Sequence, residues 1–137
     1  MLTIDAGESI NLSLRVLLNK EDQVLILDPA YMTYSAEVQL NNGIPIMVPT
    51  YDYNNFTLTI DALEKYVPLN AKAILMGFPS NPTGAIMTKA QLQNVADFSI
   101  RHNLIVINNE IYSALTYDMP HTNMASLPNM KEQTIHL

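Results

Sequence analysis

The 137-residue sequence contains no cysteine, which excludes disulfide bonds and thiolate chemistry. Basic residues are also scarce: 7 lysines and arginines stand against 13 acidic residues, for a formal net charge of -6. Without a basic patch, nucleic acid is not expected as a partner. No apolar run approaches the length of a membrane span, and the early acid Asp5 is unlike a signal peptide. These absences predict a cytoplasmic protein that does not enter a membrane.

What is present suits one globular domain, because 48% of the residues are hydrophobic and 15% are charged. Short apolar runs predict strands at 24–27, 44–48, 73–77, 104–107 and 134–137. Helical spacing predicts helices at 8–18, 31–40, 59–66 and 89–102. Strands that are apolar at every position are buried on both faces. The alternation therefore predicts an α/β fold of three layers, with a mostly parallel sheet flanked by helices.

Two sequence details place individual elements. Pro45 removes a donor from the sheet ladder, so the strand at 44–48 is expected at an edge of the sheet or with an irregular start. Thr88 and Gln91 form a capping-box pattern that predicts the start of the last helix. The buried face of that helix is predicted to contain Leu92, Val95, Ala96, Ser99 and Ile100.

The most informative stretch is Phe-Pro-Ser-Asn-Pro-Thr-Gly at 78–84, which follows the strand at 73–77. Ligands of open α/β sheets bind at the carboxyl ends of strands. Pro79 and Pro82 fix the backbone, so Asn81 is expected in a stiff, extended segment with its amide free. The competing interpretation is a plain turn, because Asn-Pro and Thr-Gly are common turn dipeptides.

Polar and aromatic side chains follow two other predicted strands. Asn109 and Tyr112 come after one apolar run, and Tyr31 comes after another. If parallel strands bring them to the same rim as Asn81, an aromatic ring, two amides and a phenol frame a site for a planar heterocycle. Each also has an ordinary structural interpretation, with the tyrosines in the core and the asparagine in a turn.

Several segments together resemble the class I and II aminotransferases, which are fold type I enzymes that use pyridoxal 5'-phosphate (PLP). The Ser-Asn-Pro-Thr-Gly at 80–84 looks like a signature of that family. Residues 5–10 are similar to its Gly-Ala-Ser-Glu-Ala-Ile segment, 28–34 to Pro-x-Tyr-x-x-Tyr, and 108–112 to Ser-Asp-Glu-Ile-Tyr. The resemblance runs from about residue 4 to residue 137.

This resemblance implies that residues 1–137 are part of a PLP-binding large domain. The implied reaction transfers an amino group between an amino acid and a 2-oxo acid, in a homodimer and without a metal. The segment 112–118 looks most like the corresponding segment of family members that act on amino acids such as aspartate or diaminopimelate derivatives. The implied cofactor contacts are the Ala6 and Gly7 amides at the phosphate, Tyr31 stacked on the ring, Asn81 and Tyr112 at the phenolic oxygen, and Asn109 at the pyridine nitrogen.

Three departures from the family pattern limit what the chain is expected to do. Asn109 replaces an aspartate that keeps the pyridine nitrogen protonated, and the adjacent Glu110 is expected to face the other way. Asp5 and Gly7 replace a glycine and a serine at the phosphate turn, which adds an acid and removes a hydroxyl donor. The Schiff-base lysine of the family would lie beyond Leu137, so no catalytic residue is assigned and the chain alone is predicted to be inactive.

Three alternatives to amino transfer stay open at this point. A PLP-dependent carbon–sulfur lyase shares the same fold and motifs. A truncated or decayed α/β module that binds no cofactor is supported by Asp5 at the phosphate turn and by the termini that the resemblance implies are missing. Uncovered sheet edges would favour its self-association. A nucleotide-binding domain matches less well, because the sequence has no glycine-rich or Walker pattern.

Overall fold

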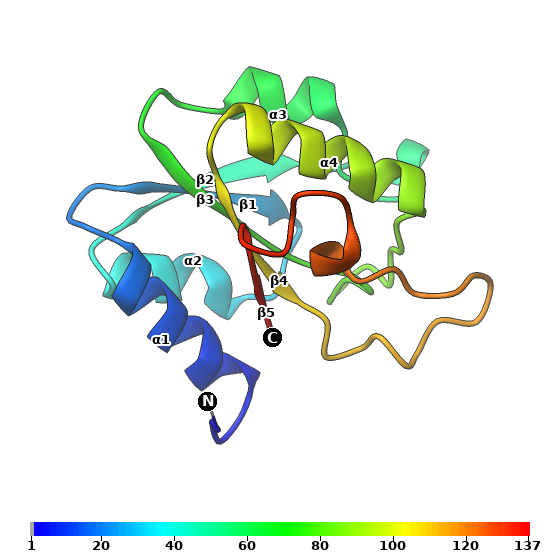
Figure 1. Ribbon diagram of the computed structural model, residues 1–137, viewed down its shortest axis with the longest axis horizontal. Helices are drawn as coiled ribbons and strands as arrows, with labels where there is room; N and C mark the ends of the chain where they lie inside the picture. The colour runs from blue at the N-terminus through cyan, green and yellow to red at the C-terminus, as the bar shows by residue number, and fades with distance from the viewer. Residues whose placement is uncertain (1) are drawn as a thin grey trace.

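The computed structural model describes residues 2–137 as one sheet with helices on both faces (Figure 1). Its elements are α1 (Ala6–Leu17), β1 (Gln23–Asp28), α2 (Thr33–Leu40), β2 (Ile44–Pro49), η1 (Asp52–Asn54), α3 (Ile60–Tyr66), β3 (Ala71–Gly77), α4 (Lys89–Arg101), β4 (Ile105–Asn109), η2 (Met124–Ser126) and β5 (Thr134–His136). The predicted alternation of helices and strands is confirmed. None of the helices in this described range has the length and hydropathy needed to cross a bilayer.

The five strands lie in the order β2-β1-β3-β4-β5, and all neighbouring pairs are parallel. Parallel neighbours need crossover connections, which α2, α3 and α4 provide for the first four strands. α1 and α2 cover one face of the sheet, and α3 and α4 cover the other (Figure 1). The predicted three-layer architecture is therefore confirmed, as is the edge position of β2 that Pro45 indicated.

Side chains of successive strand residues pack into two separate hydrophobic cores, one on each face of the sheet. Ile26 and Leu75 pack into the core beneath α1 and α2, whereas Leu25 and Ile74 pack into the core beneath α3 and α4. Side chains of adjacent strand residues point to opposite faces, so each strand needs apolar residues at every position. This is the physical reason that the strands read as continuous apolar runs.

Two predictions about element boundaries and faces are wrong. On α4, Ile100 is 37% exposed, and Phe98 is fully buried in its place. Phe98 follows Val95 by three residues and stays on its face, whereas Ile100 follows by five and lies more than a third of a turn away. β4 also continues further than predicted, so Asn108 and Asn109 are its last residues, paired in register with the end of β3.

Candidate functional site

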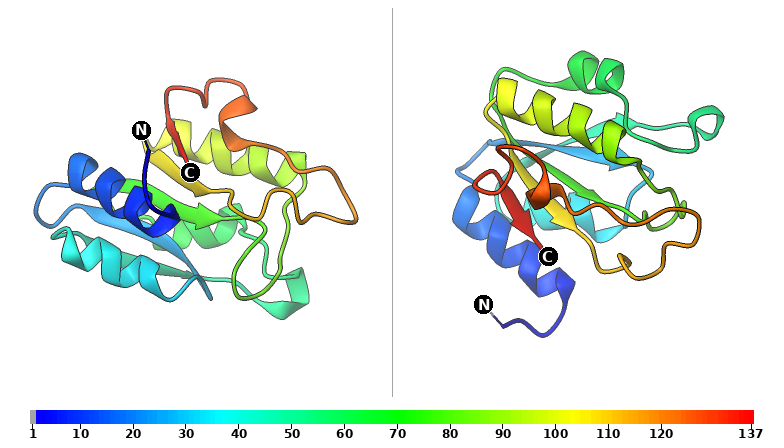
Figure 2. Two further views of the ribbon diagram at one scale, coloured as in Figure 1. Left: turned by 90° about the horizontal axis from the view of Figure 1, so that it is seen from below. Right: turned by 45° about the vertical axis from the view of Figure 1, so that its right-hand side comes forward.

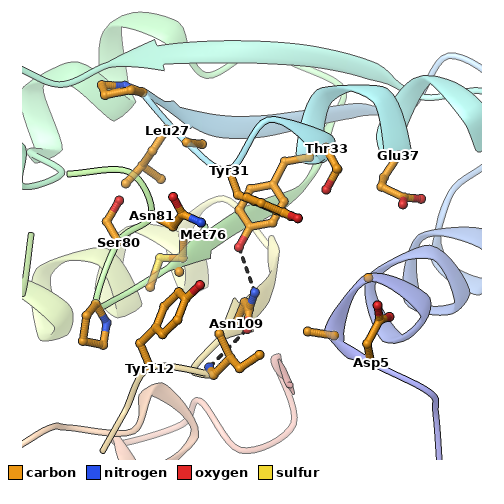
Figure 3. Close-up of a pocket in the computed structure, with 18 of the residues that line it drawn as sticks. Asp5, Leu27, Tyr31, Thr33, Glu37, Met76, Ser80, Asn81, Asn109 and Tyr112 are labelled. Carbon is orange, nitrogen blue, oxygen red and sulfur yellow. Dashed lines mark hydrogen bonds between the residues drawn. The ribbon is translucent and has the colours of Figure 1, made fainter. Parts of the chain in front are cut away.

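A cavity of about 570 Å³ opens at the carboxyl ends of β1, β3 and β4 (Figure 3). Parallel strands bring their carboxyl ends to one edge, so segments distant in sequence meet there. The structure brings together in its wall all the residues predicted to hold a cofactor: Ala6, Gly7, Tyr31, Asn81, Asn109 and Tyr112. Their roles toward a cofactor stay predictions. We call the part formed by Tyr31, Asn81, Asn109 and Tyr112 the ring end, and the part beside the first turn of α1 the α1 end.

Tyr31 and Tyr34 form the aromatic side of the ring end. Their ring centroids are 5.8 Å apart and their planes meet at 78°, an edge-to-face contact that favours both positions. Tyr31 is 41% exposed, whereas Tyr34 is only 5% exposed. Tyr34 therefore braces the ring that Tyr31 presents to the cavity.

The Asn109 amide is engaged at both of its ends. Nδ2 donates to the Tyr34 hydroxyl at 3.0 Å, and Oδ1 accepts from the backbone N–H of Ile111 at 3.2 Å (Figure 3). Because a backbone N–H can only donate, Ile111 determines which end of the amide carries the oxygen. The second N–H of Nδ2 remains for a ligand. Asn109 thus offers a donor where an aspartate would offer only acceptors.

The Tyr34 hydroxyl is a protonated group in this wall. Burial raises the pKa of the Tyr34 phenol, the hydrogen bond from Asn109 opposes part of that rise, and the nearby Tyr112 and Tyr31 add to it. Tyr34 was not among the predicted site residues. It lies in the first turn of α2, three residues after Tyr31, and this Tyr-x-x-Tyr spacing is the sequence signal that identifies it.

Gly77 provides the space in which Tyr34 and Asn109 meet. It pairs with Asn109 across the β3–β4 ladder. A Cβ at this position would lie 3.0 Å from the Tyr34 hydroxyl oxygen and 3.0 Å from the backbone oxygen of Asn109. Both distances are tighter than ordinary van der Waals contact, so a side chain here would displace one of these groups. Sequence reasoning did not identify Gly77.

Asn81 lies in a closed turn, so the prediction of an extended segment is wrong. The N–H of Gly84 donates to the carbonyl of Ser80 at 2.7 Å, and the N–H of Ser80 donates to the carbonyl of Ala85 at 2.9 Å. Gly84 has a φ of 70°, which glycine adopts without strain. Within residues 2–137 the Asn81 side chain has no hydrogen-bond partner, and it lies on the same side of the cavity as Tyr112 (Figure 3). The free amide that the sequence predicted is therefore present.

The α1 end is built on a helix terminus that is already capped. The Asp5 carboxylate accepts from the Glu8 N–H at 2.8 Å, and the Glu8 carboxylate accepts from the Ile4 N–H at 2.6 Å. This reciprocal arrangement satisfies two donors near the start of α1. The N–H groups of Ala6 and Gly7 have no partner within the described range and remain available.

Acidic side chains give the α1 end a negative charge. Asp5, Glu8 and Glu37 all line the cavity. Glu37 is held there by Asn11, whose Nδ2 donates to its carboxylate at 2.6 Å. In the part of the chain that the structure describes, no lysine, arginine or histidine lines the cavity. The ring end therefore fits a pyridine, but the α1 end does not fit a phosphate dianion.

A long segment connects β4 to β5 and projects from the body of the domain (Figure 2). Glu110, at the start of this segment, does not line the cavity, as strand periodicity predicted. It is 5% exposed, and its carboxylate contacts His121 Nε2 at 2.6 Å. It also accepts from Asn108 Nδ2 at 2.6 Å and from the Met124 N–H at 3.2 Å. Glu110 therefore holds the segment that begins with Ile111 and Tyr112, and it does not replace Asn109 in the site.

Comparisons with known proteins identify relatives along nearly the whole chain. The family model for aminotransferase class I and II matches residues 2–136. The chain is 39% identical to aromatic-amino-acid aminotransferase 2 of Thermococcus litoralis and 40% identical to aspartate aminotransferase of Pyrococcus abyssi. Each match covers 98% of this chain and 35% of the relative.

A solved structure shows the same arrangement of elements. The aromatic aminotransferase from Pyrococcus horikoshii has a TM-score of 0.95 and 40% identity, over 97% of this chain and 36% of that chain. The present chain thus spans about a third of the length of the curated relatives it matches. The matches in sequence and in fold extend over almost the whole described chain, and the chain belongs to the class I and II aminotransferase family.

Proposed function

We propose that this chain forms the ring-binding part of a PLP site in a protein that transfers an amino group from an amino acid to a 2-oxo acid. The observation that carries the proposal is the convergence of Tyr31, Asn81 and Tyr112 on one cavity from three different strand ends. The chain belongs to the class I and II aminotransferases. The proposed cofactor follows from the resemblance to these enzymes, which use PLP. The cofactor ring supplies an electron sink for the carbanion of the amino acid.

Each residue of the ring end has a distinct proposed role. Tyr31 stacks on the flat ring and fixes its plane. Asn81 and Tyr112 donate hydrogen bonds to its phenolic oxygen, for which their free amide and hydroxyl are suited. Asn109 donates an N–H to the pyridine nitrogen, which favours the unprotonated ring and so weakens the electron sink. Ala6 and Gly7 offer backbone N–H groups at the far end of the cavity.

We further propose that residues 1–137 are part of a PLP-binding large domain and do not catalyse the reaction alone. Within residues 2–137 no lysine lines the cavity, so none of them is placed to form a Schiff base there. The proposed location is the cytoplasm. The proposed assembly is a homodimer, supported by the family resemblance and by the outer edges of β2 and β5, which have no neighbouring strand within residues 2–137. Light scattering that finds only monomer at high concentration contradicts the dimer.

The proposed reaction is tested by its products. Amino transfer yields a new amino acid from the 2-oxo acid, whereas a carbon–sulfur lyase yields pyruvate and ammonia. The relatives reported above are all named aminotransferases, which favours the first outcome. Their names differ in the donor, aromatic amino acids in one and aspartate in the other, so the proposal stays at α-amino acid donor and 2-oxo acid acceptor.

The alternative is that the chain is an α/β module that binds no cofactor. A ligand-binding measurement tests it. Pyridoxamine is a suitable probe, because it carries the same ring but has no aldehyde to react with surface lysines. Saturable binding at one site supports the proposed function. The absence of saturable binding favours the alternative.

A further inference from the structure

We infer that the α1 end of the cavity selects against a phosphate dianion, so that the site binds unphosphorylated pyridoxamine at least as tightly as pyridoxamine 5'-phosphate. The inference rests on the proposed function, because it takes ring binding by Tyr31, Asn81 and Tyr112 as given. Ring binding alone does not distinguish the phosphorylated ligand from the unphosphorylated one, whereas the α1 end does.

Asp5 carries the main part of this discrimination. Its carboxylate folds back over the first turn of α1, with Oδ1 at 2.8 Å from the Glu8 nitrogen. The same oxygen would lie 3.3 Å from a Cβ built on Gly7, so it sits close beside the turn that would bind the phosphate. A helix N-terminus attracts anions through its free N–H groups. Here a protein carboxylate already takes one of those donors and adds its own negative charge.

The surrounding charges reinforce the effect of Asp5. Glu8 and Glu37 line the same cavity, and hydrogen bonds from Ile4 and Asn11 hold their carboxylates in place. No cationic side chain within residues 2–137 lines the cavity to offset them. The carboxylates and a phosphate bound in the same cavity would repel each other, although solvent exposure and salt reduce the repulsion.

Where pyridoxamine 5'-phosphate has its phosphate ester, pyridoxamine has a free hydroxymethyl group. This group suits the α1 end better than a phosphate. A hydroxyl can donate to the Asp5 carboxylate and accept from the Ala6 or Gly7 N–H, whereas a phosphate dianion can only accept. Thr33 also lines the cavity, but its Oγ1 is buried in the wall, without a hydrogen-bond partner in the described range. The groups available at this end therefore match an uncharged ligand that both donates and accepts.

The test is a fluorescence titration of the chain and its Asp5→Asn variant with two ligands. One is pyridoxamine, and the other is its phosphate ester, pyridoxamine 5'-phosphate, called the ester below. Asparagine retains N-capping ability while removing the charge, so the helix start is preserved. In the wild type, the ester is expected to bind no tighter than pyridoxamine, and added salt should not weaken its binding. Asp5→Asn should tighten ester binding about fivefold and leave pyridoxamine binding within about twofold.

A matched control is Asp22→Asn, because Asp22 also accepts from a backbone N–H, that of Asn19 at 2.8 Å, but lies outside the cavity. It should change neither affinity. Wild-type binding of the ester at least about tenfold tighter than pyridoxamine, and weakened by salt, overturns this inference while leaving the proposed function intact. An Asp5→Asn variant with unchanged ester affinity also overturns it. Binding of neither compound overturns both proposals.

Discussion

The side-chain amide of Asn109 donates a 3.0 Å hydrogen bond to the hydroxyl of Tyr34, 75 residues earlier in the chain. This contact ties the end of β4 to the start of α2. Together with the Ile111 N–H, it holds the amide in one orientation. Asn109 is therefore integrated into the cavity wall, and in the proposed site it presents a neutral donor to the ring nitrogen.

Asn109→Asp should reverse the preference of the site for the charge state of the ring. An aspartate carboxylate has no N–H to donate, and its negative charge favours a pyridinium cation. We expect the ring nitrogen of bound pyridoxamine to become more basic than in the wild type. Affinity for a pyridoxamine methylated at the ring nitrogen, which is a fixed cation, should rise about tenfold. Absorbance and fluorescence titrations measure both effects, and equal results in the two proteins contradict this account of Asn109.

The buried phenol of Tyr34 predicts a pH dependence of stability at high pH. Burial raises its pKa above the ordinary value of 10.0. A phenol raised in this way stabilises the fold fully below the unfolded pKa, and the stabilisation is lost as pH rises through the folded pKa. As pH rises above about 10, wild type should therefore lose unfolding free energy more steeply than Tyr34→Phe. Urea unfolding curves measure this difference.

Tyr117→Phe provides the matched control for that experiment, because Tyr117 is 87% exposed. Its pH profile should follow that of the wild type. A Tyr34→Phe profile with the same slope as the wild type would show that the buried phenol does not contribute.

Gly77→Ala should destabilise the protein by about 1 to 3 kcal/mol, because the new Cβ would meet the Tyr34 hydroxyl and the Asn109 carbonyl at 3.0 Å each. Tyr34→Phe removes one of these two contacts. In the double variant the cost of Gly77→Ala should therefore be smaller, and a double-mutant cycle of unfolding free energies measures the coupling. Additive costs would contradict the packing described here.

The 137-residue chain mixed with PLP, an amino acid and a 2-oxo acid should transfer amino groups no faster than PLP alone. The reason is the cavity wall, which within residues 2–137 contains no lysine and carries Asn109 at the ring end. Quantifying the new amino acid by chromatography tests this. Turnover that depends on the chain would contradict the proposal that residues 1–137 do not catalyse the reaction alone.

The sequence predicted those parts of the fold and site that depend on local patterns. Apolar runs indicated the strands, and their parallel arrangement placed Tyr31, Asn81 and Tyr112 at one edge of the sheet. The capping box of Thr88 and Gln91 begins α4 as predicted. Each of these features follows from residue type and spacing within a short window.

Features that depend on register and on contacts between distant segments were not predictable in the same way. The meeting of Tyr34, Gly77 and Asn109 requires the pairing of β3 with β4 and the placement of α2 above them. The closed turn around Asn81 depends on backbone hydrogen bonds that no residue type specifies. The acid at position 5 is visible in the sequence, but the direction of its carboxylate is visible only in the structure.

The most direct measurement of the central claim is a fluorescence titration of pyridoxamine into the wild-type chain, Tyr31→Ala and Tyr53→Ala. Tyr53 is 80% exposed and lies outside the cavity wall, so it controls for the general loss of a tyrosine. The account predicts saturable one-to-one binding that Tyr31→Ala weakens about three- to tenfold and that Tyr53→Ala leaves unchanged. The absence of saturation in the wild type, or equal binding by all three proteins, would contradict it.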